Sequence, residues 1–275
     1  MDLYNSTSSK LSLKMLTSYS TSFGFSSQLF PKEIREHIAN VYGLVRIADE
    51  IVDTYMQKDS LNILNDLEKE TLHAMSRKYS ANPIVHAFAL TANQFEFDKS
   101  LVKSFFESMR MDLYTKTHSK ASYDKYIYGS AEVIGLMCLA IFSRGNKNYY
   151  KELEHGAKRL GAAYQKINFL RDLASDNKDL GRIYFPKLDM DKFDNITKER
   201  IVQDIKKDLS AADEAIKKLA DEYKRAVVLS RNYYRALLNK IEKTDSQVLL
   251  NERVRINNFY KFFLMFKALA GDKHV

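Results

Sequence analysis

The chain contains 275 residues, of which 45% are hydrophobic and 28% charged, a composition typical of a globular protein. Its nine glycines and three prolines are too few for a fold built from many short strands and tight turns. The single cysteine, Cys138, excludes an intrachain disulfide and fits a reducing compartment, while the net charge of +8 favours an anionic partner.

The N-terminal segment 1–17 is polar and lacks the apolar core of a signal peptide. We expect this segment to be loosely attached to the rest of the chain. The longest uncharged apolar run, VIGLMCLAIF at 133–142, is much shorter than the roughly 18 residues that a membrane-spanning helix needs. The sequence therefore predicts a buried helix there and no transmembrane segment.

Apolar residues recur with helical spacing along almost the whole chain, and no stretch keeps the alternation of a strand. Pro31 stands near the start of the first predicted helix, whose apolar stripe runs as far as Tyr55. No linker or internal repeat divides the chain. The sequence predicts one all-α domain over 1–275, with further helices near 60–79, 84–94, 98–115, 121–143, 147–175, 197–220, 222–242 and 257–270.

Two of these helices, far apart in the sequence, each carry a pair of aspartates four residues apart. The pairs stand in ADEIVD (Asp49 and Asp53) and in RDLASD (Asp172 and Asp176). This spacing places both side chains of a pair on one helix face, where their repulsion costs roughly a few tenths of a kcal/mol. The same faces also carry Arg35, Ala39, Tyr42 and Arg46 in the first helix, and Gly161, Gln165 and Asn168 in the second.

Mg²⁺ fits this donor set, because it prefers oxygen and takes one or two carboxylates together with water and substrate phosphates. Two facing aspartate pairs would hold Mg²⁺ ions bridged by a diphosphate, whose oxygens Arg46 and Arg171 would bind directly. Departure of a diphosphate from an allylic carbon leaves a carbocation, which aromatic rings stabilise in a dry pocket. The candidate rings are Phe23, Phe25, Tyr42 and Tyr126. Taken singly, such a pair is more often a solvated face and such a ring more often plain core; their joint occurrence favours the metal site.

Four stretches of the chain resemble the squalene/phytoene synthase family in their order and spacing. They are SYSTSFGFSSQLFPKEIR, YGLVRIADEIVD, YIYGSAEVIGLM and LGAAYQKINFLRDLASDNKDLGRIYFP. The resemblance extends from about Ser18 to Lys267, and within the family the chain is most like bacterial phytoene synthases. It implies an all-α isoprenoid synthase helical bundle around a central cavity.

The resemblance implies an enzyme that joins two allylic prenyl diphosphates head to head through a cyclopropylcarbinyl diphosphate. The reaction depends on Mg²⁺, for which Mn²⁺ can substitute. Phytoene synthases end it by losing a proton and need no NADPH, whereas squalene synthases reduce the last cation. We therefore expect a prenyltransferase of carotenoid biosynthesis with a prenyl diphosphate substrate and no NADPH.

The resemblance also implies roles for individual residues. The expected metal ligands are Asp49, Glu50, Asp53, Asn168, Asp172 and Asp176, and the four aspartates, Tyr42 and Tyr126 are the expected catalytic residues. The expected diphosphate contacts are Ser22, Arg46, Gln165, Asn168, Arg171, Tyr234, Arg253 and Lys261. Three positions depart from the family's pattern: Glu50 stands for a second aspartate, and Glu132 and Ser108 stand for glycines. Glu132 would either lie near the reacting cation or turn to solvent.

Small side chains indicate the length of the substrate. Ala39 lies one turn from Tyr42 on the face assigned to the cavity, and Ser27 lies in the segment before that helix; with Phe23 they form the expected tail pocket. Each further isoprene unit buries five carbons, worth several kcal/mol at roughly 25 cal/mol per Å² where room exists. The sequence predicts two geranylgeranyl diphosphates (C20) giving phytoene (C40). The alternatives are a squalene or dehydrosqualene synthase using farnesyl diphosphate (C15), and a non-catalytic protein of the same fold.

The C-terminal segment NNFYKFFLMFKALAG mixes lysines with phenylalanines, so it either packs on the core or lies partly in a membrane interface. With a hydrocarbon product and a net charge of +8, we expect a cytoplasmic protein in peripheral contact with the inner face of the membrane. The basic residues are dispersed and form no recognisable docking motif, so no nucleic-acid partner is expected.

Overall fold

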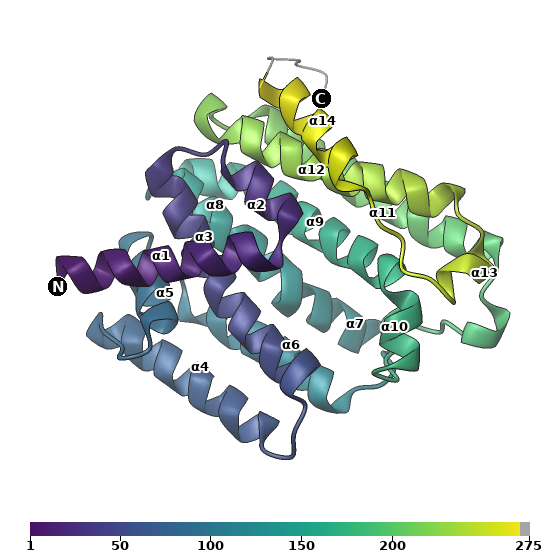
Figure 1. The fold of residues 1–275 in the computed structure, drawn as a ribbon, viewed down its shortest axis with the longest axis horizontal. Helices are drawn as coiled ribbons and strands as arrows, with labels where there is room; N and C mark the ends of the chain where they lie inside the picture. The colour runs from purple at the N-terminus through teal and green to yellow at the C-terminus, as the bar shows by residue number, and fades with distance from the viewer. Residues whose placement is uncertain (270–275) are drawn as a thin grey trace.

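The protein is a bundle of α-helices (Figure 1). The computed structural model describes residues 1–269, and within that range the only β-structure is an isolated bridge between Thr117 and Ile183. This confirms the predicted all-α fold class. The elements in chain order are α1 (Asp2–Tyr19), α2 (Thr21–Ser27), α3 (Lys32–Asp49), η1 (Glu50–Tyr55), α4 (Ser60–Arg77), α5 (Pro83–Gln94), α6 (Lys99–Tyr114), α7 (Lys120–Ile127), η2 (Tyr128–Glu132), α8 (Val133–Ser143), α9 (Lys147–Arg171), α10 (Leu173–Lys178), η3 (Met190–Lys192), α11 (Asn195–Lys217), α12 (Asp221–Lys243), α13 (Ser246–Leu249) and α14 (Asn258–Leu269).

Most of the predicted helices begin and end close to the observed ones, because apolar spacing and capping residues act locally. Asn82 caps α5 and Asp98 caps α6, each accepting hydrogen bonds from amides of the first turn. The last predicted helix, 257–270, corresponds to α14, and residue 270 lies outside the described residues.

Residues 1–17 do not form the loosely attached segment that their polar composition predicted. They belong to α1, which packs against α3 and α5. Ser8, Ser12 and Leu16 of α1 are buried. Gly43 of α3 allows the close approach, since a Cβ there would lie 3.1 Å from the Ser12 hydroxyl oxygen. Small hydroxyl side chains fill much of this contact, so the hydrophobic pattern does not reveal it.

Two large hydrophobic clusters hold the helices together. One joins α3, α4, α5, α6 and α8 around residues such as Phe88 and Phe106. The other joins α7, α9, α11 and α12 around residues such as Ile167 and Leu238. The aspartate-bearing ends of α3 and α9 are therefore anchored in different clusters, and tertiary packing sets how the two pairs face each other.

The first aspartate pair stands where a helix changes its geometry. α3 ends at Asp49, and the chain continues as the π-helical turn η1, which contains Asp53. This turn ends at Met56, which adopts a left-handed conformation with φ of 47°. Single π-helical turns within α-helices are frequent at functional sites, because they change the direction in which side chains point.

The predicted continuous helix over 147–175 is wrong at one residue. α9 ends at Arg171, and Asp172, with φ of −101° and ψ of 9°, separates it from the short helix α10. The amides of Asp172 and Asp176 still donate to the carbonyls four residues before them. The chain therefore bends at Asp172, and the carboxylates of Asp172 and Asp176 do not lie along one unbroken helix.

Within residues 1–269, one stretch is long and apolar enough to cross a membrane, namely Lys120–Ser143, which comprises α7, η2 and α8. Of its most apolar window, 61% is buried inside the protein, where α8 contacts α3, α6 and α9. Such burial is usual for a core helix, as the sequence predicted for 133–142.

Candidate active site

The first aspartate pair has cationic and aromatic neighbours. Arg46 donates through Nε to Glu50 Oε1 at 2.9 Å, and its guanidinium lies 3.9 Å from the Asp49 carboxylate. The same guanidinium lies 4.5 Å from the centre of the Tyr19 ring at the end of α1. Burial is the largest single influence and opposes ionisation of Glu50, but the hydrogen bond from Arg46, the charge of Arg46 and smaller hydrogen bonds together outweigh it and lower the pKa of Glu50. Glu50, an expected metal ligand, is thus an ion-pair partner of Arg46 in this structure.

The second aspartate pair lies beside two arginines. Arg171 donates to both carboxylate oxygens of Asp172, at 2.9 and 2.5 Å. Arg253, from the segment before α14, approaches the same carboxylate at 2.6 Å. Both arginines were predicted as diphosphate contacts, and the structure brings them together at one aspartate. Two guanidinium groups this close form a site for an anion with several oxygens.

The two aspartate pairs share one electrostatic environment. Burial and then the charge of Asp53 raise the pKa of Asp49 to about 8, and Arg46 opposes them. Burial, followed by the charges of Asp172 and Asp53, raises the pKa of Asp176 to about 7. Because Asp53 acts on a member of each pair, the pairs lie near each other in the folded chain. Carboxylates gathered in this way attract cations.

A buried arginine that the sequence did not single out connects the first pair to the core. Arg182 stands in GRIYFP after the second pair and is 3% exposed. Its Nη1 donates to Asp53 at 2.6 Å, and its Nη2 donates to the Val52 carbonyl at 2.8 Å. Asp112 of α6 lies 3.8 Å from the same guanidinium. A basic residue just after an acidic pair was the signal in the sequence, but only folding reveals its partners.

Asp112 is the centre of a second cluster, which the sequence did not predict. Its oxygens accept hydrogen bonds from the hydroxyls of Tyr126 and Tyr184, both at 2.8 Å. Burial raises the pKa of Asp112 to about 7, against the charge of Arg182. The Tyr184 ring stacks on Phe169 with centroids 4.0 Å apart. Tyr126, an expected catalytic residue, is therefore buried with its hydroxyl held by Asp112.

A second group of aromatic rings lies near Tyr42. Burial is the main cause that raises the pKa of Tyr42 to about 12, and neighbouring Tyr234 adds to it. Tyr234 stacks on Tyr164, with ring centres 3.8 Å apart. Phe23 contacts both rings, at 6.1 Å from Tyr164 and 5.9 Å from Tyr234. Phe23, Tyr42 and Tyr234 were expected from the sequence, whereas Tyr164 was not.

A lysine of α14 joins the cationic side of the site. Lys261 donates to the Thr21 hydroxyl of α2 at 2.7 Å. Burial, with the charge of Arg171 in addition, lowers the pKa of Lys261, so its ammonium lies near the arginine–aspartate pair. Ser22, another predicted diphosphate contact, follows Thr21 and is half-buried. The short helix α2 near the N-terminus and α14 near the C-terminus thus meet beside Arg171.

The oxygen donors around the two pairs fit Mg²⁺. They are carboxylates and one amide oxygen, which suit a hard ion. The amide oxygen, Asn168 Oδ1, is buried and has no hydrogen-bond partner among residues 1–269. Gln165, one turn before Asn168, is half-buried. Over residues 1–269 no three acidic, histidine or cysteine side chains converge into a metal-binding cluster. Asp53 and Asp172 instead contact arginines. The donors fit an ion that is shared with substrate phosphates.

The small residues expected to line the tail pocket are both buried, Ala39 at 0% and Ser27 at 2% exposure. Ser27 donates its hydroxyl to the Gly24 carbonyl within α2 at 2.9 Å. Phe25, a candidate cavity ring, instead lies against Phe262 of α14, with ring centres 4.7 Å apart. It packs on the small hydrophobic cluster between α12 and α14. The prediction for Phe25 is wrong, because Phe23 and Phe25 stand two positions apart in α2 and therefore point to different sides of the helix.

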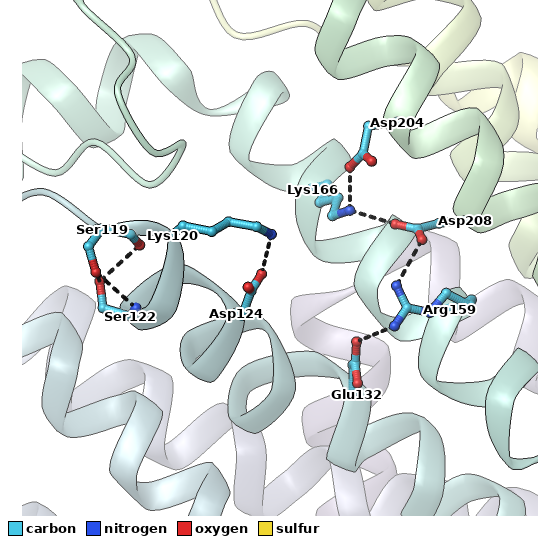
Figure 2. Close-up of polar contacts among 9 residues, drawn as sticks. All are labelled: Ser119, Lys120, Ser122, Asp124, Glu132, Arg159, Lys166, Asp204 and Asp208. Atoms are coloured by element: carbon cyan, nitrogen blue, oxygen red, sulfur yellow. Dashed lines mark hydrogen bonds and ion pairs between the residues drawn. The ribbon is translucent and has the colours of Figure 1, made fainter.

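Glu132, for which the sequence left two orientations open, is buried in an ion-pair network (Figure 2). Its carboxylate lies 3.5 Å from Arg159 of α9, and Arg159 lies 3.2 Å from Asp208 of α11. Asp208 also contacts Lys166 at 2.7 Å, and Lys166 contacts Asp204 at 2.5 Å. The network connects η2, α9 and α11, which explains how an acidic residue is accommodated here.

Ser108, the other residue that stands for a glycine, is 1% exposed and donates to the Tyr126 carbonyl at 3.2 Å. Gly129 of η2 makes room for it, since a Cβ at Gly129 would lie 2.1 Å from the Ser108 hydroxyl oxygen. Ser108 therefore helps to hold the backbone that carries the Tyr126 ring.

Comparison with known proteins gives consistent matches. The family model described as squalene/phytoene synthase matches residues 16–260. The chain is 25% identical to the 4,4'-diapophytoene synthase of Staphylococcus haemolyticus, covering 90% of this chain and 91% of that protein. It is 26% identical to the phytoene synthase of Arthrospira platensis, covering 94% and 92%.

Solved structures show the same fold. A dehydrosqualene synthase in complex with ligand has a TM-score of 0.84 at 21% identity, covering 98% of both chains. The squalene synthase HpnC from Alicyclobacillus acidocaldarius has a TM-score of 0.76 at 19% identity, covering 88% of this chain and 95% of that one.

Proposed function

Because the chain belongs to the squalene/phytoene synthase family, whose members are head-to-head prenyltransferases, we propose that it condenses two geranylgeranyl diphosphates to phytoene. The observation that carries the proposal is the meeting of two aspartate pairs with Arg171, Arg253 and Lys261. Negative donors for metal ions and positive donors for phosphate oxygens then lie on adjacent sides of one site, as a diphosphate leaving group requires.

The proposed metal is Mg²⁺, with Mn²⁺ as a substitute, held by Asp49, Asp53, Asp172 and Asp176 with Asn168. When bound, it neutralises charge that develops on the leaving diphosphate. Asn168 presents a buried oxygen that accepts no hydrogen bond from the described part of the chain, which suits this role. Asp172 positions its arginines, since both guanidinium groups contact its carboxylate.

In the proposed reaction the C–O bond of one allylic diphosphate breaks, and the resulting cation adds to the double bond of the second molecule. Loss of a proton gives the cyclopropylcarbinyl diphosphate. Its diphosphate then leaves, the cation rearranges, and loss of a second proton gives phytoene without NADPH. Phe23, Tyr42 and the stacked Tyr164 and Tyr234 provide ring faces close to the arginines, where a cation is stabilised.

The C20 substrate is proposed because Ala39 and Ser27 are both small and buried. Similarity to the phytoene synthase of Arthrospira platensis over 94% of the chain supports it. A second candidate is condensation of farnesyl diphosphate to a C30 product, dehydrosqualene or squalene. It is favoured by the comparable similarity to a diapophytoene synthase and by the fold of a dehydrosqualene synthase.

Product analysis tests the proposed function. Purified protein is incubated with Mg²⁺ and either geranylgeranyl or farnesyl diphosphate, without NADPH, and extracted hydrocarbons are identified by mass. We expect a C40 product that disappears with EDTA and in Asp172→Asn. A C30 product would retain the family's reaction and select the second candidate. No product from either substrate, with folded protein and lipid present, would favour the non-catalytic alternative.

Larger side chains in the proposed tail pocket test the substrate assignment separately, because they leave less room for the tail. Ala39→Trp should shift the preference from the C20 to the C15 substrate, because the indole occupies space that the longer tail needs. Ser27→Phe should act in the same direction from α2. The control is Ile196→Trp at an exposed position of α11, where preference should not change. The ratio of kcat/KM for the two substrates is the measurement, and an unchanged ratio in folded variants contradicts the pocket assignment.

We also propose a cytoplasmic protein in peripheral contact with the inner face of the membrane. The hydrocarbon product and the net charge of +8 support this location.

A further inference from the structure

The outer side of α14 concentrates exposed aromatic side chains. Phe259 is 83% exposed, Phe263 is 49% exposed and Phe266 is 66% exposed. These positions are separated by four and three residues, so the three rings share one side of the helix. Tyr260 and Phe262 lie beside them and are also exposed. We call Phe259, Tyr260, Phe262, Phe263 and Phe266 the aromatic face.

The opposite side of α14 holds this helix on the protein. Leu264 and Ala268 are buried in a cluster with Leu229 and Tyr233 of α12. Tyr233 also donates its hydroxyl to the Lys261 carbonyl at 3.1 Å. Figure 1 shows α14 along the edge of the bundle beside α12. The aromatic face is therefore displayed by an anchored helix.

Within α14 the charged side chains all have one sign. The helix sequence NFYKFFLMFKAL contains two lysines and no acidic residue. The Lys267 ammonium lies 5.4 Å from the centre of the Phe263 ring, so a cation borders the face. Arg255 is exposed just before the helix. Aromatic rings bordered by cations without acids are typical of helices that lie in the interface of an anionic bilayer.

A second copy of this chain is a poorer occupant of the aromatic face. The five rings together expose almost three whole aromatic side chains, so at roughly 200 Å² a ring the face would bury on the order of 600 Å² per copy and, with every exposed ring atom covered, would only reach the lower limit of a specific interface. Specific protein–protein interfaces bury about 1,200–2,000 Å² in total. A bilayer requires no such minimum, because each ring that enters the interface contributes its own apolar area.

We propose that α14 docks the protein on an anionic lipid bilayer through the aromatic face. The same helix carries Lys261, which contacts Thr21 and lies near Arg171. Docking therefore places the cationic side of the candidate site next to the membrane surface. That consequence rests on the proposed function, because a prenyl diphosphate substrate and a hydrocarbon product would then pass between the lipid and the site.

An introduced tryptophan measures insertion directly. The chain contains no tryptophan, so Phe263→Trp provides a single indole reporter. We expect its emission to shift to the blue with phosphatidylcholine vesicles that contain phosphatidylglycerol, and to be quenched by brominated acyl chains. The matched control is Tyr114→Trp on α6, whose position is 63% exposed, and it should show neither change. An unshifted Phe263→Trp spectrum overturns the proposal.

Vesicle flotation measures affinity. The triple variant Phe259→Ser, Phe263→Ser, Phe266→Ser should bind anionic vesicles about a hundredfold more weakly or worse, given the apolar area of three rings. The control Leu3→Ser, Tyr114→Ser, Ile196→Ser removes three exposed apolar side chains elsewhere and should bind like the wild type. Added salt should weaken wild-type binding. Equal binding of wild type and triple variant, or equal binding to vesicles of phosphatidylcholine alone, overturns the proposal.

Two further measurements separate this proposal from its rivals. Sedimentation without lipid should show the same mass for wild type and triple variant; self-association that the triple variant loses would assign the face to a second copy. With substrate dispersed in detergent, the triple variant should keep wild-type turnover, whereas turnover of vesicle-borne substrate should fall. A wild-type protein that binds vesicles but converts no prenyl diphosphate would overturn the proposed function and leave the docking surface intact.

Discussion

Three of the four site aspartates have an arginine within 4 Å. Arg46 approaches Asp49, Arg171 approaches Asp172, and Arg182 approaches Asp53. The first two arginines lie within one turn of their aspartates, so sequence spacing revealed them. Arg182 lies 129 residues from Asp53, and only folding brings them together.

Removing the buried arginine should cost far more stability than removing an exposed one. Arg182→Met should lower the free energy of unfolding by about 3–5 kcal/mol, because it leaves buried Asp112 without its cation. Arg253→Gln is the control: its side chain is 46% exposed, and its loss should cost less than about 1 kcal/mol. Urea unfolding measures both, and similar small losses would show that Arg182 is not needed to neutralise the cluster.

Helix ends, rather than helix interiors, carry the candidate site. Asp49 ends α3, Asp53 lies in the π-helical turn η1, and Asp172 separates α9 from α10. Apolar periodicity predicts where a helix exists, but a π turn or a bend changes that periodicity by only one residue. The sequence therefore predicted the helices and the aspartates they carry, but it did not predict the π-helical turn after Asp49 or the bend at Asp172.

α1 shows the opposite case, an element that contains the segment 1–17, for which the sequence predicted loose attachment. Leu16 is 1% exposed at its contact with the bundle, whereas Leu11 is 43% exposed on the same helix. Leu16→Ala should lower the free energy of unfolding by about 2–5 kcal/mol through a cavity in the packed interior. Leu11→Ala should change it by less than about 0.5 kcal/mol. Thermal and urea unfolding provide the comparison, and an equally small effect at both positions would mean that α1 is loosely attached after all.

Across the whole molecule, two hydrophobic clusters bring the aspartate pairs to one site. Asp49 and Asp176 belong to helices anchored in different clusters, yet both have pKa values raised by burial and by neighbouring carboxylates. Packing of the apolar faces thus forces like charges together, and a bound cation would relieve the repulsion.

Stability should therefore depend on pH and on Mg²⁺ together. Folded-state pKa values of about 8 for Asp49 and about 7 for Asp176 lie above the value of about 3.9 in an unfolded chain. The folded protein holds protons that the unfolded chain releases, so this contribution to stability is fully present below about pH 4, falls as the pH rises above it, and is lost completely once the pH has passed through about 7 to 8. Without divalent metal the unfolding temperature should fall across that range. Mg²⁺ should reduce the fall, because it binds the deprotonated carboxylates.

Calorimetry with EDTA or Mg²⁺ at a series of pH values measures this dependence. The double variant Asp49→Asn, Asp176→Asn removes both titrating groups and should show a flatter pH profile and a smaller Mg²⁺ effect. A wild-type unfolding temperature that rises across the same pH range without metal would contradict the pKa argument. A Mg²⁺ effect that the double variant retains in full would place the ion elsewhere.

The sequence by itself determined the helical fold class, the positions of most helices, the two aspartate pairs and their neighbouring arginines. These features depend on spacing along one helix, which the amino-acid order contains. Tertiary structure decided the burial of α1, the ion-pair network around Glu132, the contacts of Arg182 and Asp112, and the side on which Phe25 packs. Each of these depends on which faces of distant helices meet, and that is set by the packing of many apolar side chains at once.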